Sequence, residues 1–174
     1  VQGEIGERIE DDMRIEFEIE RNHVIDMDKV GIDKNDFQSE TATRNDINQI
    51  VSLLMEDPEY QNVYEEEILR EQMHDRFDGN FSTYFIVRKD EKVVASCSTY
   101  GEVEGFALLG GVIVHPDYRR RGLAADVENY ACNYLSKRGT SVVGFVNFNN
   151  SPSLKLHEKL GAVTISTLFK FVRR

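Results

Sequence analysis

Apolar and charged residues alternate without interruption over residues 13–20, a period of two that predicts a half-buried β-strand. The apolar face of this strand consists of Met13, Ile15, Phe17 and Ile19. Residues 23–27 fit a returning strand after a turn at Arg21 and Asn22. The N-terminal part of the chain is therefore expected to hold β-structure of its own.

Residues 28–37 are polar and typical of a linker. We therefore divide the chain into an N-terminal extension over residues 1–37, either a β-hairpin or the end of an upstream domain, and a domain over residues 38–174. Helical periods in that domain cover residues 47–54, 62–76, 123–138 and 150–160. Strand patterns cover residues 83–88, 92–100, 104–114, 141–148 and 163–172. This order predicts an α/β fold, with a mixed sheet flanked by helices on both faces.

Length and composition limit the class of protein. The chain has 174 residues, of which 40% are hydrophobic, enough for one core. No apolar run approaches the roughly 18 residues of a membrane span, and the first residues lack a secretion signal. Cys97 and Cys132 form no metal-binding spacing and suit reduced thiols. We therefore expect a cytoplasmic protein with neither a membrane segment nor a metal.

Charge is distributed unevenly along the chain. The net charge of −10 argues against a nucleic-acid partner. Residues 1–80 carry 23 acidic and 8 basic side chains, whereas residues 81–174 carry 8 acidic and 13 basic ones. A polyanionic cofactor therefore suits the C-terminal half, and a cationic acceptor would be drawn to the N-terminal half, unless the acidic surface only confers solubility. The N-terminal strand could also pair with a second copy in a homodimer.

A basic turn follows the strand that ends at Val114. The turn contains Arg119, Arg120, Arg121 and Gly122, and a helix begins directly after it. A helix start offers unpaired backbone N–H groups to an anion, and glycine leaves room for a phosphate to approach them. The alternative is a solvated basic turn. Neither the nucleoside-triphosphate nor the dinucleotide glycine pattern is present here.

Two motifs resemble those of the GNAT superfamily of N-acetyltransferases. The first, Arg-x-x-Gly-x-Ala after a Val-x-Pro strand end, is matched by Val114, Pro116, Arg119, Gly122 and Ala124. The second lies over residues 150–162 and is similar to the family's Asn-x-x-Ala-x-x-Leu-Tyr-x-Lys-x-Gly-Phe, with serine, histidine and alanine in place of its Ala, Tyr and Phe. The resemblance covers roughly residues 38–174. It implies a GNAT-like fold, with a central and mostly antiparallel mixed sheet.

The resemblance also implies where acetyl-CoA would bind. The residues expected to hold the pyrophosphate are Arg119, Arg120, Arg121, Gly122, Leu123, Ala124 and Ala125. The backbone of Val112, Ile113 and Val114 would hold the pantetheine arm, and Asn150 would steady the cofactor from the second motif. Gly110 and Gly111 precede this stretch and suggest a bulge, although they could instead relieve crowding between packed layers.

Candidate catalytic residues follow from the chemistry of acetyl transfer. An alkyl ammonium with a pKa near 10.4 must lose a proton before it can attack a thioester. The two positions where the family often carries a glutamate are Leu108 and Phe145 here, so Glu104 becomes the candidate base, or else an ordinary surface residue. His157 stands where the family has a tyrosine that protonates the leaving thiolate. Histidine could act as that acid, or its role could be structural.

The sequence thus predicts an N-acetyltransferase that transfers an acetyl group from acetyl-CoA directly to a primary amine of a small, cationic molecule. One alternative is a non-catalytic GNAT-like module that binds acyl-CoA or a partner protein. Another is a protein or peptide N-acetyltransferase.

Overall fold

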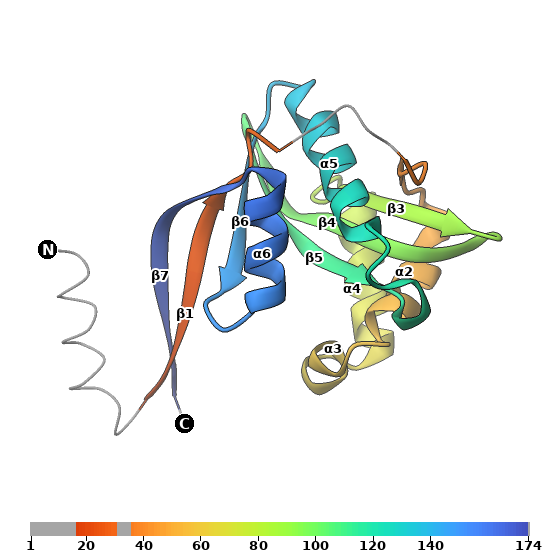
Figure 1. Cartoon of the computed structure of the whole chain (residues 1–174). Helices are drawn as coiled ribbons and strands as arrows, with labels where there is room; N and C mark the ends of the chain where they lie inside the picture. The colour runs from red at the N-terminus through yellow and green to blue at the C-terminus, as the bar shows by residue number, and fades with distance from the viewer. Residues whose placement is uncertain (1–16, 31–35, 174) are drawn as a thin grey trace, which may run out of the picture.

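The computed structural model describes residues 17–30 and 36–173, which form a seven-stranded sheet in the order β2-β3-β4-β5-β6-β1-β7 (Figure 1). The strands are β1 (Phe17–Asp26), β2 (Glu40–Thr41), β3 (Tyr84–Lys89), β4 (Lys92–Val103), β5 (Phe106–Val114), β6 (Ser141–Asn147) and β7 (Val163–Arg173). β5 and β6 pair in parallel, and every other neighbouring pair in this sheet is antiparallel. The prediction of a mixed and mostly antiparallel sheet is confirmed.

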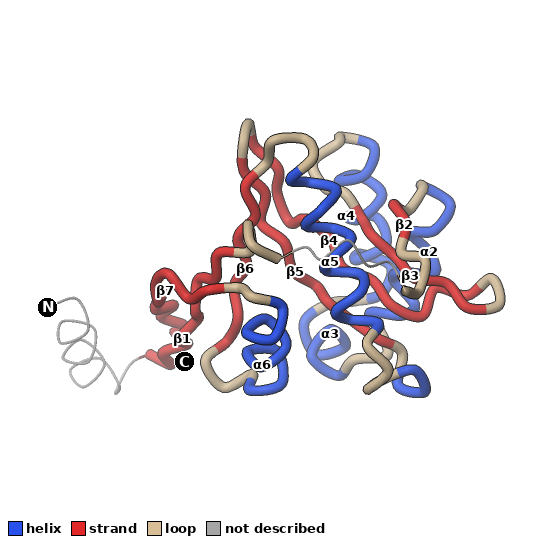
Figure 2. The backbone as a smooth tube through the Cα atoms, turned by 45° about the horizontal axis from the view of Figure 1, so that its top comes forward, coloured by secondary structure: helices blue, strands red, loops and turns tan. Residues whose placement is uncertain are grey.

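The helices lie on both faces of the sheet. They are α2 (Ile47–Leu54), α3 (Pro58–Val63), α4 (Glu66–Asp78), α5 (Leu123–Ser136) and α6 (Ser151–Leu160), with short 3₁₀ turns η1 (Arg44–Asp46) and η2 (Pro116–Tyr118). α5 and α6 cover one face, and α2 and α4 cover the other (Figures 1 and 2). The alternation of side chains along β3 serves both layers, because Phe85 and Val87 pack under α5 while Tyr84 and Ile86 pack under α2 and α4.

The N-terminal strand differs from the prediction. Residues 17–26 form one continuous strand between β6 and β7, so the predicted turn at Arg21 and Asn22 and the returning strand are wrong. Asn22 pairs with β6 on one side and β7 on the other, and this double ladder keeps the backbone extended through the position of the expected turn. β1 therefore belongs to the same sheet as the strands after residue 37, and the predicted N-terminal extension shares this sheet with the predicted domain. Residues 13–16 of the predicted strand lie outside the described residues.

Two other elements have bounds that differ from the predicted ones. The single helix expected over residues 62–76 is instead α3 followed by α4, with Tyr64 in an extended conformation between them. α3 begins early because the side chain of Asp57 accepts a hydrogen bond from the backbone N–H of Glu59 over 2.9 Å, and Pro58 suits the first helical position. β5 begins at Phe106 rather than at residue 104.

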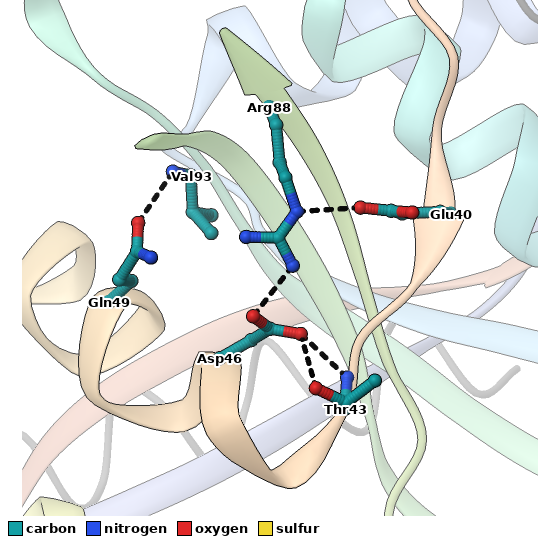
Figure 3. Close-up of polar contacts among 6 residues, drawn as sticks. All are labelled: Glu40, Thr43, Asp46, Gln49, Arg88 and Val93. Carbon is teal, nitrogen blue, oxygen red and sulfur yellow. Dashed lines mark hydrogen bonds and ion pairs between the residues drawn. The ribbon is translucent and has the colours of Figure 1, made fainter. Parts of the chain in front are cut away.

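An ion pair between the buried Asp46 and the half-buried Arg88 anchors the start of α2 to the sheet (Figure 3). Arg88 at the end of β3 lies 2.6 Å from a carboxylate oxygen of Asp46 and donates a hydrogen bond to Glu40 over 2.7 Å. The other oxygen of Asp46 accepts from the backbone N–H and the hydroxyl of Thr43. Burial alone would raise the pKa of Asp46, but the contacts with Arg88 and Thr43 outweigh it and lower that pKa. The first turn of α2 is therefore fixed on β2 and β3.

Candidate acetyl-CoA site and acetyl-transfer pocket

The two parallel strands at the centre of the sheet, β5 and β6, are paired over only the first half of their length. β5 pairs with β6 only over residues 106–109, opposite residues 141–144. Beyond this point β5 continues against β4 alone, while β6 runs on beside β1, and the two strands diverge (Figure 1). A gap therefore opens beside the second half of β5, where the strand edge has no partner strand among the described residues.

The strand bends where the gap begins. Gly111 has a φ of +62°, and the pairing of β5 with β4 shifts register between Gly110 and Ile113. The two glycines thus form an irregularity of the bulge type that the sequence suggested, because the left-handed conformation favours glycine. Val112, Ile113 and Val114 follow the bend. The backbone N–H of His115 donates to Val94 of β4, so by strand alternation the backbone groups of Val114 and Val112 face the gap.

The turn after β5 leaves backbone N–H groups available at the start of α5. Arg120 and Gly122 both have positive φ angles, +63° and +94°, and α5 begins at Leu123. The first helical hydrogen bond runs from Asp126 N–H to Gly122 O over 3.0 Å. The amides of residues 123–125 precede that bond and have no carbonyl of their own helix to pair with. A phosphate can therefore be bound at this helix start.

The arginines of the turn are exposed and held in different ways. Arg119 donates through Nε to the backbone oxygen of Val114 over 3.0 Å, and the guanidinium of Arg121 lies 5.4 Å from the ring centre of Tyr118. Asp126 in the first turn of α5 does not oppose them at the surface. Its buried carboxylate accepts instead from the backbone N–H of Asp36 and the hydroxyl of Ser39. The turn therefore presents positive charge to solvent.

Asn150 lies on the loop that leads into α6. It is the N-cap residue of this helix, and its side-chain oxygen accepts a hydrogen bond from the backbone N–H of Ser153 over 3.1 Å. Asn150 itself is exposed. Its contact with the cofactor, like the contacts of the other predicted binding residues, stays a prediction.

His157 is buried, and both of its ring nitrogens lie within hydrogen-bonding distance of other groups of the protein. Nε2 lies 2.8 Å from Oε1 of Glu128, and Nδ1 lies 2.7 Å from the backbone oxygen of Ser153. A carbonyl oxygen can only accept, so Nδ1 carries a proton. Burial alone would lower the pKa of His157, but the hydrogen bond and charge of Glu128, with the Ser153 contact, raise it overall. No ring N–H is left to face a thiolate.

Glu104 is not near the bend. It lies in the exposed turn between β4 and β5 rather than on a strand, and the residues of β5 that separate this turn from Gly111 span about 16 Å. The neighbouring Glu102 accepts hydrogen bonds from the hydroxyls of Thr83 and Thr99. A carboxylate at Glu104 is too far from the bend to take a proton directly from an amine there.

A cluster of hydroxyl groups, which the sequence analysis did not identify, meets at the bend. A side-chain carbon placed at Gly111 would lie 3.0 Å from the hydroxyl oxygen of Tyr100, 3.4 Å from that of Tyr60 and 3.5 Å from Oγ of Ser98. The two tyrosine hydroxyls are 3.1 Å apart, and burial raises the pKa of Tyr60. A cavity of about 30 Å³ lies beside them. Tyr60 comes from α3, and no sequence signal places that helix against β4.

The remaining groups that could carry chemistry are few. Within residues 17–30 and 36–173, no cluster of three or more His, Cys, Asp or Glu side chains could hold a metal ion. Both cysteines are buried, and burial raises the pKa of each thiol. In the same part of the chain, no helix is long and apolar enough to cross a membrane.

Solved structures share this architecture. A GNAT acetyltransferase from Novosphingobium aromaticivorans is 16% identical with a TM-score of 0.71, and the alignment covers 91% of this chain and 67% of that one. An acetyltransferase from Clostridium acetobutylicum with acetyl-CoA is 13% identical, TM-score 0.57, covering 74% and 90%. An aminoglycoside antibiotic 6′-N-acetyltransferase from Acinetobacter haemolyticus is 16% identical, TM-score 0.63, covering 78% and 97%. Identities this low show the fold alone.

The chain spans between 57 and 67% of the length of three larger structures that it matches. No curated protein sequence shows significant similarity to it. The sequence profile of the acetyltransferase (GNAT) family, however, matches residues 47–162, which is well over half of the chain. That match includes the gap, the basic turn and the whole of both motifs. The chain therefore belongs to the GNAT family of acetyltransferases.

Proposed function

We propose that this protein transfers an acetyl group from acetyl-CoA directly to a primary amine of a small cationic molecule. The observation that carries the proposal is the gap between β5 and β6, which begins at the bend and leads to the free amides of α5. Members of the family use acetyl-CoA. In this chain the amides of residues 123–125 and the exposed arginines would hold its pyrophosphate, and the β5 backbone would hold its pantetheine arm.

The acetyl group would then lie at the bend, near Gly111. Here the hydroxyls of Tyr60, Tyr100 and Ser98 can orient an incoming amine by hydrogen bonds. The neutral amine attacks the thioester carbonyl carbon, the carbon–sulfur bond breaks, and coenzyme A leaves as a thiolate. The proton lost by the amine passes to water, and the thiolate takes up a proton in turn. Direct transfer needs no covalent intermediate on the protein.

The acidic side chains of the segment that includes α3 and α4, close to the hydroxyl cluster, are the reason for proposing a cationic acceptor. Residues 56–78, which include α3 and α4, carry nine acidic side chains and two arginines. Arg70 is already paired with Glu66 and Glu67. The negative potential of this segment would raise the local concentration of an ammonium substrate. Polyamines, aminoglycosides and basic peptide ends share that chemistry.

A second candidate is a module that binds acyl-CoA without transferring the acyl group. The observation in its favour is that the two positions where the family often carries a glutamate, Leu108 and Phe145, are apolar here and lie on one face of β5 and β6. Such a module would retain the cofactor site and lack only the chemistry at the bend.

Two measurements separate these candidates. Calorimetric titration with acetyl-CoA tests the cofactor site, and a thiol-release assay over a panel of polyamines, aminoglycosides, basic peptides and neutral amines tests the transfer. We expect binding together with release that depends on a cationic amine. Binding without release on any amine would support the module. Release confined to peptides would support a peptide N-acetyltransferase.

A further inference from the structure

Glu128 and His157 form a buried pair between two helices. Glu128 lies in the middle of α5, His157 lies near the end of α6, and 2.8 Å separates Oε1 of the glutamate from Nε2 of the histidine. Their side chains are only 1% and 9% exposed. The second carboxylate oxygen of Glu128 is buried and has no hydrogen-bond partner among the described residues.

The glutamate of this pair lies in the apolar core of this side of the sheet, whereas the histidine also borders a pocket that His23 and Glu158 line. The side chains of the core on this side of the sheet include Cys97, Val127, Ala131 and Cys132. Burial is the main cause that raises the pKa of both thiols, and the negative charge of Glu128 adds to it, so this carboxylate acts within the core. Well-packed apolar side chains would fill such a space with similar or greater stability. A buried pair of this kind is therefore better explained by the geometry that it fixes.

The geometry concerns the two motif helices. The first turn of α5 presents the free amides, and the N-cap residue of α6 is Asn150. His157 cannot rotate freely, because its Nδ1 donates to the backbone oxygen of Ser153 within the same helix while its Nε2 meets Glu128. Each end of the ring is thus fixed to a different helix. The pair holds α6 in a defined place against α5.

We propose that Glu128 is a positioning residue, which acts through His157 to hold the second motif against the pyrophosphate-binding helix, and that His157 serves this contact rather than proton transfer. The inference rests on the proposed use of acetyl-CoA. Cofactor affinity depends on both helices, because the turn before α5 and the loop before α6 contribute to one site. Loss of the contact would therefore weaken binding before it slowed the chemical step.

The test measures cofactor binding separately from turnover. Glu128→Gln keeps the shape of the side chain and removes its charge, and His157→Phe removes both ring donors. We expect each to raise the dissociation constant for acetyl-CoA about tenfold, with kcat at saturating acetyl-CoA within about twofold of the parent. The double variant should bind no more weakly than either single variant, because one contact is lost in all three.

The controls separate positioning from other roles. Glu158→Gln makes the same substitution at an exposed neighbour on α6 and should leave affinity unchanged. His157→Gln, which can keep a donor toward Glu128, should bind within about threefold of the parent. If Glu128→Gln does not fold, the comparison of His157→Gln with His157→Phe tests the same contact.

Unchanged affinity in folded Glu128→Gln and His157→Phe would overturn the proposal. So would a fall in kcat of about a hundredfold in His157→Phe with unchanged affinity, since that result would identify an acid. Failure of the parent protein to bind acetyl-CoA would instead contradict the proposed function, and failure to acetylate any amine would leave the binding test intact.

Discussion

Nε of Arg119 donates a hydrogen bond to the backbone oxygen of Val114 over 3.0 Å, which ties the first arginine of the basic turn to the last residue of β5. Arg119→Ala removes this tie and one positive charge beside the helix start. The guanidinium would make a charge-assisted contact with the pyrophosphate, and contacts of this kind contribute about 1.5–3 kcal/mol, so we expect acetyl-CoA to bind at least about tenfold more weakly in calorimetry. Arg138→Ala, which removes an exposed arginine bound to Tyr134, is the matched control. Equal losses in both variants would contradict a specific role for Arg119.

Two glycines at the ends of α5 offer a second comparison. Gly122 precedes the helix with a φ of +94°, and Gly139 follows it with a φ of +73°. An alanine in this conformation costs about 1–2 kcal/mol at either position. Only Gly122→Ala should also weaken acetyl-CoA binding, by about tenfold or more, because strain at Gly122 shifts the start of α5, whose amides would bind the phosphate, while the new Cβ itself would lie 3.5 Å from the ring of Phe37. Gly139→Ala should lower the melting temperature alone. Full binding by a folded Gly122→Ala would contradict the proposed phosphate site.

The hydroxyl cluster at the bend makes a kinetic prediction. Tyr60→Phe and Tyr100→Phe each remove one oxygen near Gly111. We expect kcat with a cationic amine to fall about tenfold or more in each variant, while acetyl-CoA affinity stays within about twofold, because the hydroxyls orient the amine rather than the cofactor. Tyr134→Phe removes a hydroxyl bound to Arg138, away from the bend, and is the control. If kcat is unchanged in both variants, the amine does not use these hydroxyls.

The half-buried ion pair of Asp46 and Arg88 predicts a difference in stability. Asp46→Ala leaves the guanidinium of Arg88 with only its contact to the exposed Glu40 and removes the acceptor of the Thr43 hydrogen bonds, and we expect a loss of about 2 kcal/mol in the free energy of unfolding. Asp78→Ala breaks the exposed pair with Arg44 and should destabilise the protein much less, because solvent screens this pair. Urea denaturation of both variants at neutral pH measures the difference. Losses of equal size would show that burial of the Asp46 pair is unimportant.

The pKa of His157 gives a prediction for pH. A histidine whose pKa is raised on folding stabilises the folded state fully below its unfolded pKa of about 6.5, and this contribution is lost as the pH rises through the folded pKa. The difference in unfolding free energy between the parent and Glu128→Gln should therefore be largest near about pH 6 and shrink above it. Other titratable groups around the pair are Cys97, Cys132, His23 and Glu158. A difference that grows with pH would contradict a charged His157.

The sequence predicted the parts of the site that follow from local rules. The helix start at Leu123 and the bulge at the two glycines depend on residues close together in the chain, and the structure shows both. The place of β1 between β6 and β7 could not be predicted in this way, because it depends on pairing with strands more than a hundred residues away. Alternation over residues 13–20 indicated a strand without naming its partners.

The same limit applied to side chains that meet across elements. His157 was identified by its place in the second motif. Its partner Glu128 lies on another helix, 29 residues earlier, and the sequence indicated only that this residue is helical. Tyr60 and Tyr100 meet across 40 residues. Glu104 was expected at the start of a strand over residues 104–114, but it lies in the turn between β4 and β5. Long-range contacts of this kind required the fold.

We propose that the acetyl group of acetyl-CoA is transferred to an amine at the bend of β5. The most direct test incubates the protein with acetyl-CoA and the amine panel and analyses each amine by mass spectrometry, alongside free coenzyme A. We expect a cationic amine to gain one acetyl group on nitrogen, with release of an equal amount of coenzyme A, and we expect a much lower yield with Tyr100→Phe. Tight binding of acetyl-CoA with no acetylated amine in the panel would contradict this proposal.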